Sequence, residues 1–221
     1  MGIEERKQRE KEARRNQIIK TARKEFIHSG LRHASIKEIA RKAELSPRTI
    51  YTYFNNKQEL YGAVLLNGLR ILRKKIEKIV SREDDPAKAL ELVKKAYASF
   101  YKTNREYFRI MIFIGFHDIH EEVGGAICQE ISDAVVDCIS TVSEIIRKGK
   151  KQEVFNGGDP KKLSWLLWSI FIGIGHLNEA RTSLDSGRRD FEGLFDFAYR
   201  TMMCNGNNEL AGRSMTRRDS S

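Results

Sequence analysis

The short segment from Arg48 to Tyr53 is rich in side chains that can contact DNA. If the helix it forms points Ile50 into a core, a step of about 100° per residue places Arg48 and Thr52 on the opposite face, with Thr49 and Tyr51 on the flanks. Arginine can bridge guanine O6 and N7, threonine can contact the thymine methyl group, and tyrosine can reach a phosphate or a base edge. The segment therefore predicts a helix that reads a DNA major groove.

The residues around this segment supply the helix starts that would position it. Ser46 followed by Pro47 is typical of an N-cap and the first residue of a helix. Ser35 and Glu38 have the spacing of a capping box, which predicts the start of the preceding helix. Two short helices joined by a turn of about three residues make a helix-turn-helix, which we place at about residues 35–54.

Longer helical patterns flank this motif. A run without Gly or Pro over residues 4–29 has apolar side chains at helical spacing, and Gly30 occupies the position of a C′ cap. A weaker capping box, Asn56 with Glu59, starts a helix that we expect over 57–80. Further helices are expected at about 87–103, 105–116, 119–148, 160–184 and 189–204. The tail over 205–221 has almost nothing to bury, so we expect it to be disordered.

The composition indicates an all-α protein with a basic N-terminal third. The chain has 221 residues, is 40% hydrophobic and contains only 3 Pro. Residues 1–80 hold 20 Lys and Arg against 9 Asp and Glu, whereas residues 81–221 hold 20 against 21. The excess of positive charge in the first third implies a polyanionic partner, either a nucleic acid or an anionic membrane.

Several features disfavour a membrane partner and a secreted protein. The N-terminus has no apolar signal region. The most apolar stretch, Leu163 to Leu177, spans 15 residues, and a bilayer-spanning helix needs about 20. The basic N-terminal arm has no apolar face with Trp or Phe, which disfavours binding to a membrane surface. The sequence leaves open whether this arm contacts DNA. Three scattered cysteines fit free thiols, so we expect a cytoplasmic protein.

The helix-turn-helix and its neighbours resemble the TetR-type DNA-binding domain over about residues 14–65. The matching positions are Ile19, Ala22, Phe26, Gly30, Ser35, Ile36, Ile39, Ala40, Ala43, Leu45, Ser46, Pro47, Arg48, Thr49, Ile50, Tyr51, Tyr53, Phe54, Lys57 and Leu60. The resemblance implies phosphate contacts for Ser35, Tyr51, Tyr53 and Lys57. It implies base contacts for Lys37, Arg48, Thr49 and Thr52. The chain departs from the family in the turn, where Glu44 stands in place of the usual Gly and would be strained if this position needs φ > 0.

The resemblance also implies how the whole chain is organised. It implies a DNA-binding head at residues 12–72, a helical ligand-binding and dimerisation domain at 73–204, and no cofactor. The homodimer would be a repressor on a palindromic operator in double-stranded DNA, released when a small, largely apolar or aromatic effector binds the C-terminal domain. An activator with the same head is one alternative. A non-specific architectural DNA-binding protein is another, which the nearly neutral C-terminal part disfavours.

Aromatic and polar side chains of the C-terminal part are candidates for lining the effector pocket, with ordinary core packing as the alternative for each. The candidates are Tyr97, Phe100, Tyr101, Phe108, Met111, Phe116, His117, Trp168 and His176. The apolar stretch over 163–177, paired with the helix that begins near Phe191, predicts a four-helix dimer interface. The alternative is that this stretch is simply the central core helix of the domain.

The sequence gives little support for metal binding or for enzymatic catalysis. His117, His120 and Glu121 have a spacing that can bind Zn²⁺, but no further Cys or His cluster completes four ligands, so we predict no metal site. The chain has no G-x-S-x-G motif, no P-loop, no dinucleotide fingerprint after a strand and no Cys–His pair that can be placed as a nucleophile. We therefore expect that the protein is not an enzyme.

Overall fold

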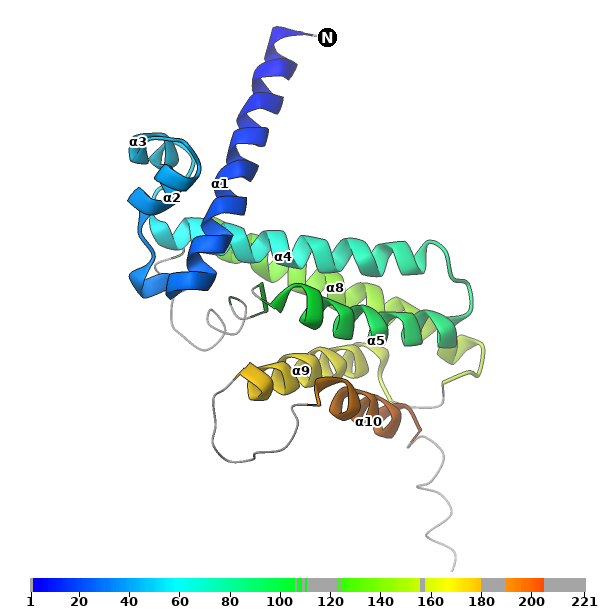
Figure 1. Cartoon of the computed structure of the whole chain (residues 1–221). Helices are drawn as coiled ribbons and strands as arrows, with labels where there is room; N and C mark the ends of the chain where they lie inside the picture. Colours follow the sequence, from blue (N-terminus) through cyan, green and yellow to red (C-terminus); the bar gives the residue numbers. More distant parts are fainter. Residues whose placement is uncertain are drawn as a thin grey trace, which may run out of the picture. The chain divides into compact units, whose positions relative to one another are not determined.

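The computed structural model describes residues 2–105, 107, 108, 110, 123, 125–155, 158–179 and 190–204, and every regular element in these residues is an α-helix (Figure 1). The helices are α1 (Ile3–His33), α2 (Ile36–Lys42), α3 (Pro47–Tyr51), α4 (Lys57–Val80), α5 (Pro86–Thr103), α8 (Gly125–Lys151), α9 (Pro160–Glu179) and α10 (Phe191–Cys204). The predicted all-α fold is therefore confirmed. The helix expected over 105–116 lies mostly outside the described residues, as does the tail from residue 205.

The chain forms two compact units. Unit 1 comprises residues 1–71 and 104–135, and unit 2 comprises residues 72–103 and 136–221. Helices α4 and α8 each contribute their first part to unit 1 and their second part to unit 2. The domain limits expected from the sequence stay a prediction.

Three helices begin at the N-cap residues that the sequence predicts. Ser46 accepts a hydrogen bond from the Thr49 amide at 3.1 Å, and Asp159 accepts one from the Lys162 amide at 2.8 Å, so both predicted N-caps are confirmed. Asn56 likewise accepts from the Glu59 amide at 2.7 Å, and α4 begins and ends where the pattern predicts.

Two local predictions were wrong. Ser35 is the N-cap residue of α2, but its side chain forms no cap hydrogen bond, and the Glu38 carboxylate of the expected capping box binds Arg41 instead. Helix α1 does not end at Gly30 but continues to His33. The extra turn brings Ala34 into the core with only 5% of its surface exposed, and burial of that residue offsets the low helix propensity of Gly30.

Unit 1 has an apolar core beneath the helix-turn-helix. Ile18, Ile19 and Phe26 of α1 are buried, as the helical spacing predicts, and the Phe26 ring meets Tyr61 of α4 edge-on at 4.9 Å. Farther along α4, Gly68 allows the Tyr107 ring to lie directly against the helix backbone, since a Cβ atom at this position would come within 2.7 Å of Tyr107. The Phe26–Tyr61 contact packs α1 against the first part of α4, and the Gly68–Tyr107 contact packs residue 107 against the same helix.

Unit 2 is built around a cluster of aromatic rings. Tyr97 of α5 stacks on Phe171 of α9 with ring centroids 4.6 Å apart, and Tyr101 stacks on Phe191 of α10 at 4.2 Å. Phe195 meets the Tyr97 ring edge-on. All five rings are buried, and deep burial raises the pKa of Tyr97 well above its usual range. This cluster joins α5, α9 and α10.

Candidate nucleic-acid interface

Helix α3 is short, and its N-terminal end is fixed by the residues that begin it. Pro47 provides the first residue with a preset φ, and Ser46 caps the helix through the Thr49 amide. Ile50 is fully buried and Phe54 is 2% exposed. The apolar face of α3 is therefore anchored, and rotation of the helix about its axis would expose Ile50.

The opposite face of α3 is open to solvent. Arg48 and Thr52 are exposed, and Tyr51 is 52% exposed, which is unusual for a large aromatic side chain. Thr49 is half-buried, and its hydroxyl lies 2.9 Å from that of Ser46. The Thr52 hydroxyl donates to the Thr49 carbonyl at 2.7 Å, so both threonine hydroxyls already have partners within the helix.

The turn between α2 and α3 contains the residue where the chain departs from the family pattern. Glu44 has φ = 56°, in the left-handed region that favours glycine. The Leu45 amide donates to the Ala40 carbonyl at 2.9 Å and closes the turn. Gln17 of α1 donates its side-chain amide to the Ala43 carbonyl at 2.9 Å. A side chain 26 positions away in the sequence therefore holds the turn in place, and no local pattern predicts this contact.

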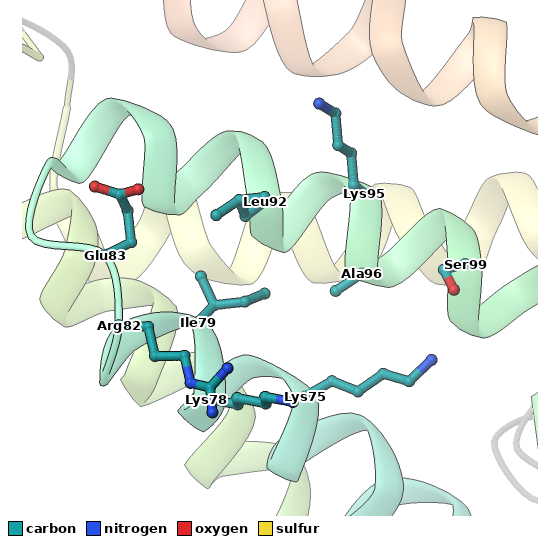
Figure 2. A pocket seen from close by; sticks show the side chains of 9 residues that line it. All are labelled: Lys75, Lys78, Ile79, Arg82, Glu83, Leu92, Lys95, Ala96 and Ser99. Atoms are coloured by element: carbon teal, nitrogen blue, oxygen red, sulfur yellow. The ribbon is translucent and has the colours of Figure 1, made fainter.

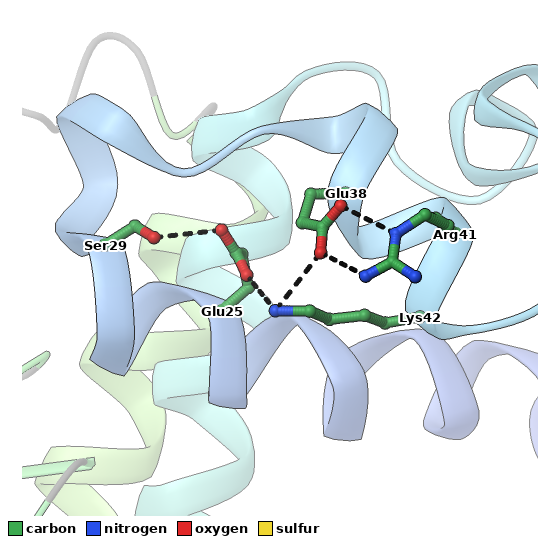
Figure 3. Close-up of polar contacts among 5 residues, drawn as sticks. All are labelled: Glu25, Ser29, Glu38, Arg41 and Lys42. Carbon is green, nitrogen blue, oxygen red and sulfur yellow. Dashed lines mark hydrogen bonds and ion pairs between the residues drawn. The ribbon is translucent and has the colours of Figure 1, made fainter.

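A charged network binds α2 to α1 (Figure 3). The Lys42 ammonium lies 2.7 Å from the Glu25 carboxylate and 3.5 Å from that of Glu38. Glu25 is only 4% exposed and also accepts a hydrogen bond from Ser29 at 3.0 Å. Glu38 is paired with Arg41 through two hydrogen bonds, of 2.9 and 2.6 Å. The network fixes the orientation of α2, and with it the turn and α3, relative to α1.

The same network shifts the acidity of its carboxyl groups. The hydrogen bond from Lys42 lowers the pKa of Glu25 in spite of its burial. The Arg41 guanidinium, with a further contribution from Lys42, lowers the pKa of Glu38 to about 2. Both groups are charged near neutral pH, so the ion pairs that hold α2 are present there.

The other residues predicted to contact phosphates or bases lie around α3. Ser35 and Lys37 are exposed at the start of α2, and Tyr53 is half-buried. Lys57 is half-buried at the start of α4, where its ammonium donates to the Ala34 carbonyl at 3.2 Å. Lys57 therefore also closes the end of α1 onto α4.

The candidate effector residues that the structure describes are packed in cores. Tyr97, Phe100 and Phe108 are almost completely buried, Trp168 is 7% exposed, and the ring centroids of Trp168 and Tyr97 are 6.1 Å apart. Tyr101 is buried and donates a hydrogen bond to Glu179 at 3.1 Å, and His176 is half-buried on α9. Phe108 belongs to unit 1, apart from the others. The remaining three candidates, Met111, Phe116 and His117, lie outside the described residues.

Neither a metal site nor a membrane span is found in the part of the chain that the structure describes. No group of three or more His, Cys, Asp or Glu residues there is arranged to hold a metal ion, and the motif from His117 to Glu121 lies outside it. No helix among these residues is long and apolar enough to cross a bilayer. Cys128 and Cys138 are free thiols.

The fold and the exposed face of α3 define a class: an all-α protein with an N-terminal helix-turn-helix of the DNA-binding type. Comparison with known proteins gives the family. Residues 18–64 match the model of the bacterial regulatory proteins of the tetR family. The match lies in the helix-turn-helix head, which is therefore similar to the heads of the TetR-family transcriptional regulators.

Related sequences and structures extend beyond the head. An uncharacterised regulator, YhgD of Bacillus subtilis, is 23% identical over 73% of this chain and 82% of its own length. The transcriptional activator FasR of Mycolicibacterium smegmatis is 27% identical over 59% of this chain and 60% of its own. The crystal structure of FadR from Bacillus subtilis in complex with stearoyl-CoA has a TM-score of 0.67 at 16% identity, and it covers 85% of this chain and 96% of that one. The structural likeness extends the shared fold to the C-terminal helices.

Proposed function

We propose that the protein is a sequence-specific, ligand-responsive repressor that binds a near-palindromic operator as a homodimer. The observation that carries this proposal is helix α3, which is anchored by its buried apolar face and presents Arg48, Tyr51 and Thr52 on its exposed face. Arg48 and Thr49 would contact base edges together with Lys37 and Thr52. Ser35, Tyr51, Tyr53 and Lys57 would contact phosphates.

The surface of unit 2 supports the homodimer. Leu177 and Phe197 are 66% and 70% exposed, and Trp165 is 42% exposed. On α9 the exposed side chains surround Ser169 and Gly173, and a Cβ atom added at Gly173 would meet nothing within 4 Å. Large apolar side chains around small residues on two adjacent helices suit a four-helix interface with a second copy. In such a dimer the two α3 helices would lie about 34–36 Å apart, one turn of DNA.

The effector part of the proposal rests on the relatives and on composition. The solved FadR structure holds stearoyl-CoA, which has a long apolar chain. Unit 2 of this protein contains the cluster of Tyr97, Trp168 and Phe171, which an apolar or aromatic effector could enter by displacing rings. Binding there would favour a conformation of α4 in which the two recognition helices no longer fit one operator.

Selection of binding sites from random duplexes with the purified full chain at about 150 mM salt tests the first part of the proposal. We expect recovery of a motif with two-fold symmetry and half-sites one helical turn apart. A pool without any motif would contradict sequence-specific binding. Placing the recovered operator before a reporter gene then separates the two modes of regulation, because a repressor lowers the reporter signal. A raised signal would favour activation, as the name of the relative FasR indicates for that protein.

A further inference from the structure

A groove on unit 2 runs between the end of α4 and the middle of α5 (Figure 2). Its volume is about 480 Å³, within the range of about 300–1,000 Å³ that small-molecule sites occupy. The groove is lined by Lys75, Lys78, Ile79, Arg82, Glu83, Leu92, Lys95, Ala96 and Ser99. None of the candidate effector residues is among them, so the groove is distinct from the aromatic cluster.

The floor of the groove is apolar. Ile79 of α4 faces Leu92 and Ala96 of α5 (Figure 2). Leu92 is 39% exposed and Ile79 is half-buried, so both keep apolar surface in contact with water. A single exposed leucine is ordinary on a protein surface. Here the exposed leucine shares a hollow with other apolar side chains, and burying that surface would favour binding of an apolar chain.

The rim on the α4 side is basic. Lys75, Lys78 and Arg82 surround Ile79, and none of them has an ion pair within the residues that the structure describes. The acid of the groove, Glu83, accepts a hydrogen bond from the Asp85 amide at 3.1 Å. Lys95 lies 3.9 Å from Glu91 and extends away from α4 in Figure 2, so it is not part of the basic rim.

Favourable interaction with the dipole of α4 accounts for only part of the positive charge of the basic rim. Basic residues at the C-terminal end of a helix offset a partial charge of about −0.5. Three cations within two turns exceed that charge, and Lys75 lies more than a turn before the end of α4 at Val80. The rim therefore has a surplus of positive charge directly beside an apolar floor.

We propose that this groove binds a single-chain amphiphile with one anionic head group, such as a medium-chain fatty carboxylate. The chain lies on Ile79, Leu92 and Ala96, and the carboxylate accepts hydrogen bonds from Lys78 and Arg82. A nucleic acid would use the cations but leave the apolar floor exposed, and a neutral apolar ligand would use only the floor. This second ligand site goes beyond the proposed function and does not depend on DNA binding.

Titration calorimetry of the full chain with decanoate, with 1-decanol and acetate as partial ligands, tests the site. We expect decanoate to bind, and acetate and decanol to bind at least about tenfold more weakly because each lacks one half of the interaction. The double variant Lys78→Gln/Arg82→Gln and the variant Leu92→Gln should each weaken decanoate binding about tenfold or more. The matched control is Lys161→Gln/Lys162→Gln, which removes the same charge from the exposed start of α9 and should leave binding unchanged.

Two results would overturn the proposal. The first is decanoate binding that survives in both groove variants, which would place the ligand elsewhere, for example in the aromatic cluster. The second is the absence of decanoate binding to the wild-type chain, including the case in which vesicles of phosphatidylglycerol bind instead. Neither result would contradict the proposed binding to an operator, because the selection of duplexes measures DNA binding alone. The two proposals can therefore fail independently.

Discussion

At the scale of single residues, Glu44 combines an unfavourable backbone conformation with a place beside the recognition helix. With φ = 56°, it occupies the left-handed region that only glycine adopts without strain. The Glu44→Gly variant should be more stable than the wild type by about 0.5–1 kcal/mol, as measured by urea unfolding. Glu44→Ala is the matched control, because it removes the charge but not the strain, and it should give no such gain. Equal stabilisation by both variants would show that the charge, not the backbone, was the cause.

The residue scale also shows what local sequence predicts well. The N-caps Ser46 and Asp159 depend on atoms within three residues of each other, and both were predicted. The contacts of Gln17 with Ala43 and of Lys42 with Glu25 join residues 26 and 17 positions apart, and no local pattern contains them. The base-reading and phosphate-binding roles of the residues in and around α3 stay predictions, since they require a DNA partner to test.

At the level of helices, the packing of α2 against α1 should depend on pH. The ion-pair network that joins them consists of Glu25, Glu38, Arg41 and Lys42. The pKa of both carboxyl groups is lower in the folded state than in the unfolded chain, and that of Glu38 falls to about 2. Their stabilisation is therefore complete above the unfolded pKa of about 4.5, and it is lost as the pH falls through the folded values. The difference in unfolding free energy between the wild type and Glu25→Gln/Glu38→Gln should shrink from about pH 6 to pH 3.

A control separates this effect from the general acid sensitivity of a charged surface. Glu10 forms an exposed pair with Arg6 at 2.9 Å, and exposed pairs of this kind contribute little. Glu10→Gln should therefore follow the wild type across the same pH range. A stability difference for Glu25→Gln/Glu38→Gln that stayed constant with pH would contradict the assignment of these pKa shifts to the ion pairs.

The packing of α4 in unit 1 depends on one glycine. A Cβ atom at Gly68 would come within 2.7 Å of Cβ and Cγ of Tyr107, which is 3% exposed and whose hydroxyl lies 3.3 Å from Arg23. Because these atoms lie close to the Tyr107 backbone, a change of the Tyr107 rotamer cannot relieve the clash. Gly68→Ala should destabilise the protein by about 1–3 kcal/mol despite the better helix propensity of Ala. Gly125→Ala, at a position where nothing lies within 4 Å, should be neutral, and equal effects of the two substitutions in thermal unfolding would refute this account.

The end of α1 and the start of α2 differ from what their local sequence predicts. Helix α1 passes through Gly30 because burial of Ala34 outweighs a weak local stop signal. The Ser35 capping box failed because Glu38 has two basic neighbours on its own helix, and an ion pair there competes with the cap. Tertiary contacts and charge pairing decide such cases, and neither is visible in a short window of sequence.

At the scale of the whole molecule, the apolar surface of α9 and α10 predicts the dimer. Phe197 is 70% exposed, and burying such a side chain against a second copy contributes about 1.5–3 kcal/mol. Phe197→Asp should convert the protein from a dimer to a monomer in sedimentation analysis at micromolar concentration. Val154→Asp is the control, since Val154 is also an exposed apolar residue, 45% exposed, but lies after α8. A dimer that persists in Phe197→Asp would place the interface elsewhere.

Reading of DNA bases by α3 depends above all on Arg48, so the Arg48→Ala variant is the decisive test. The measurement is the affinity of wild type and Arg48→Ala for the selected operator and for a scrambled duplex of equal length and salt. We predict a loss of about 1–3 kcal/mol on the operator and little change on the scrambled duplex, whereas Lys57→Ala should weaken both alike and reduce the salt slope by about 1. An equal loss on both duplexes for Arg48→Ala would contradict base reading and make Arg48 a phosphate contact.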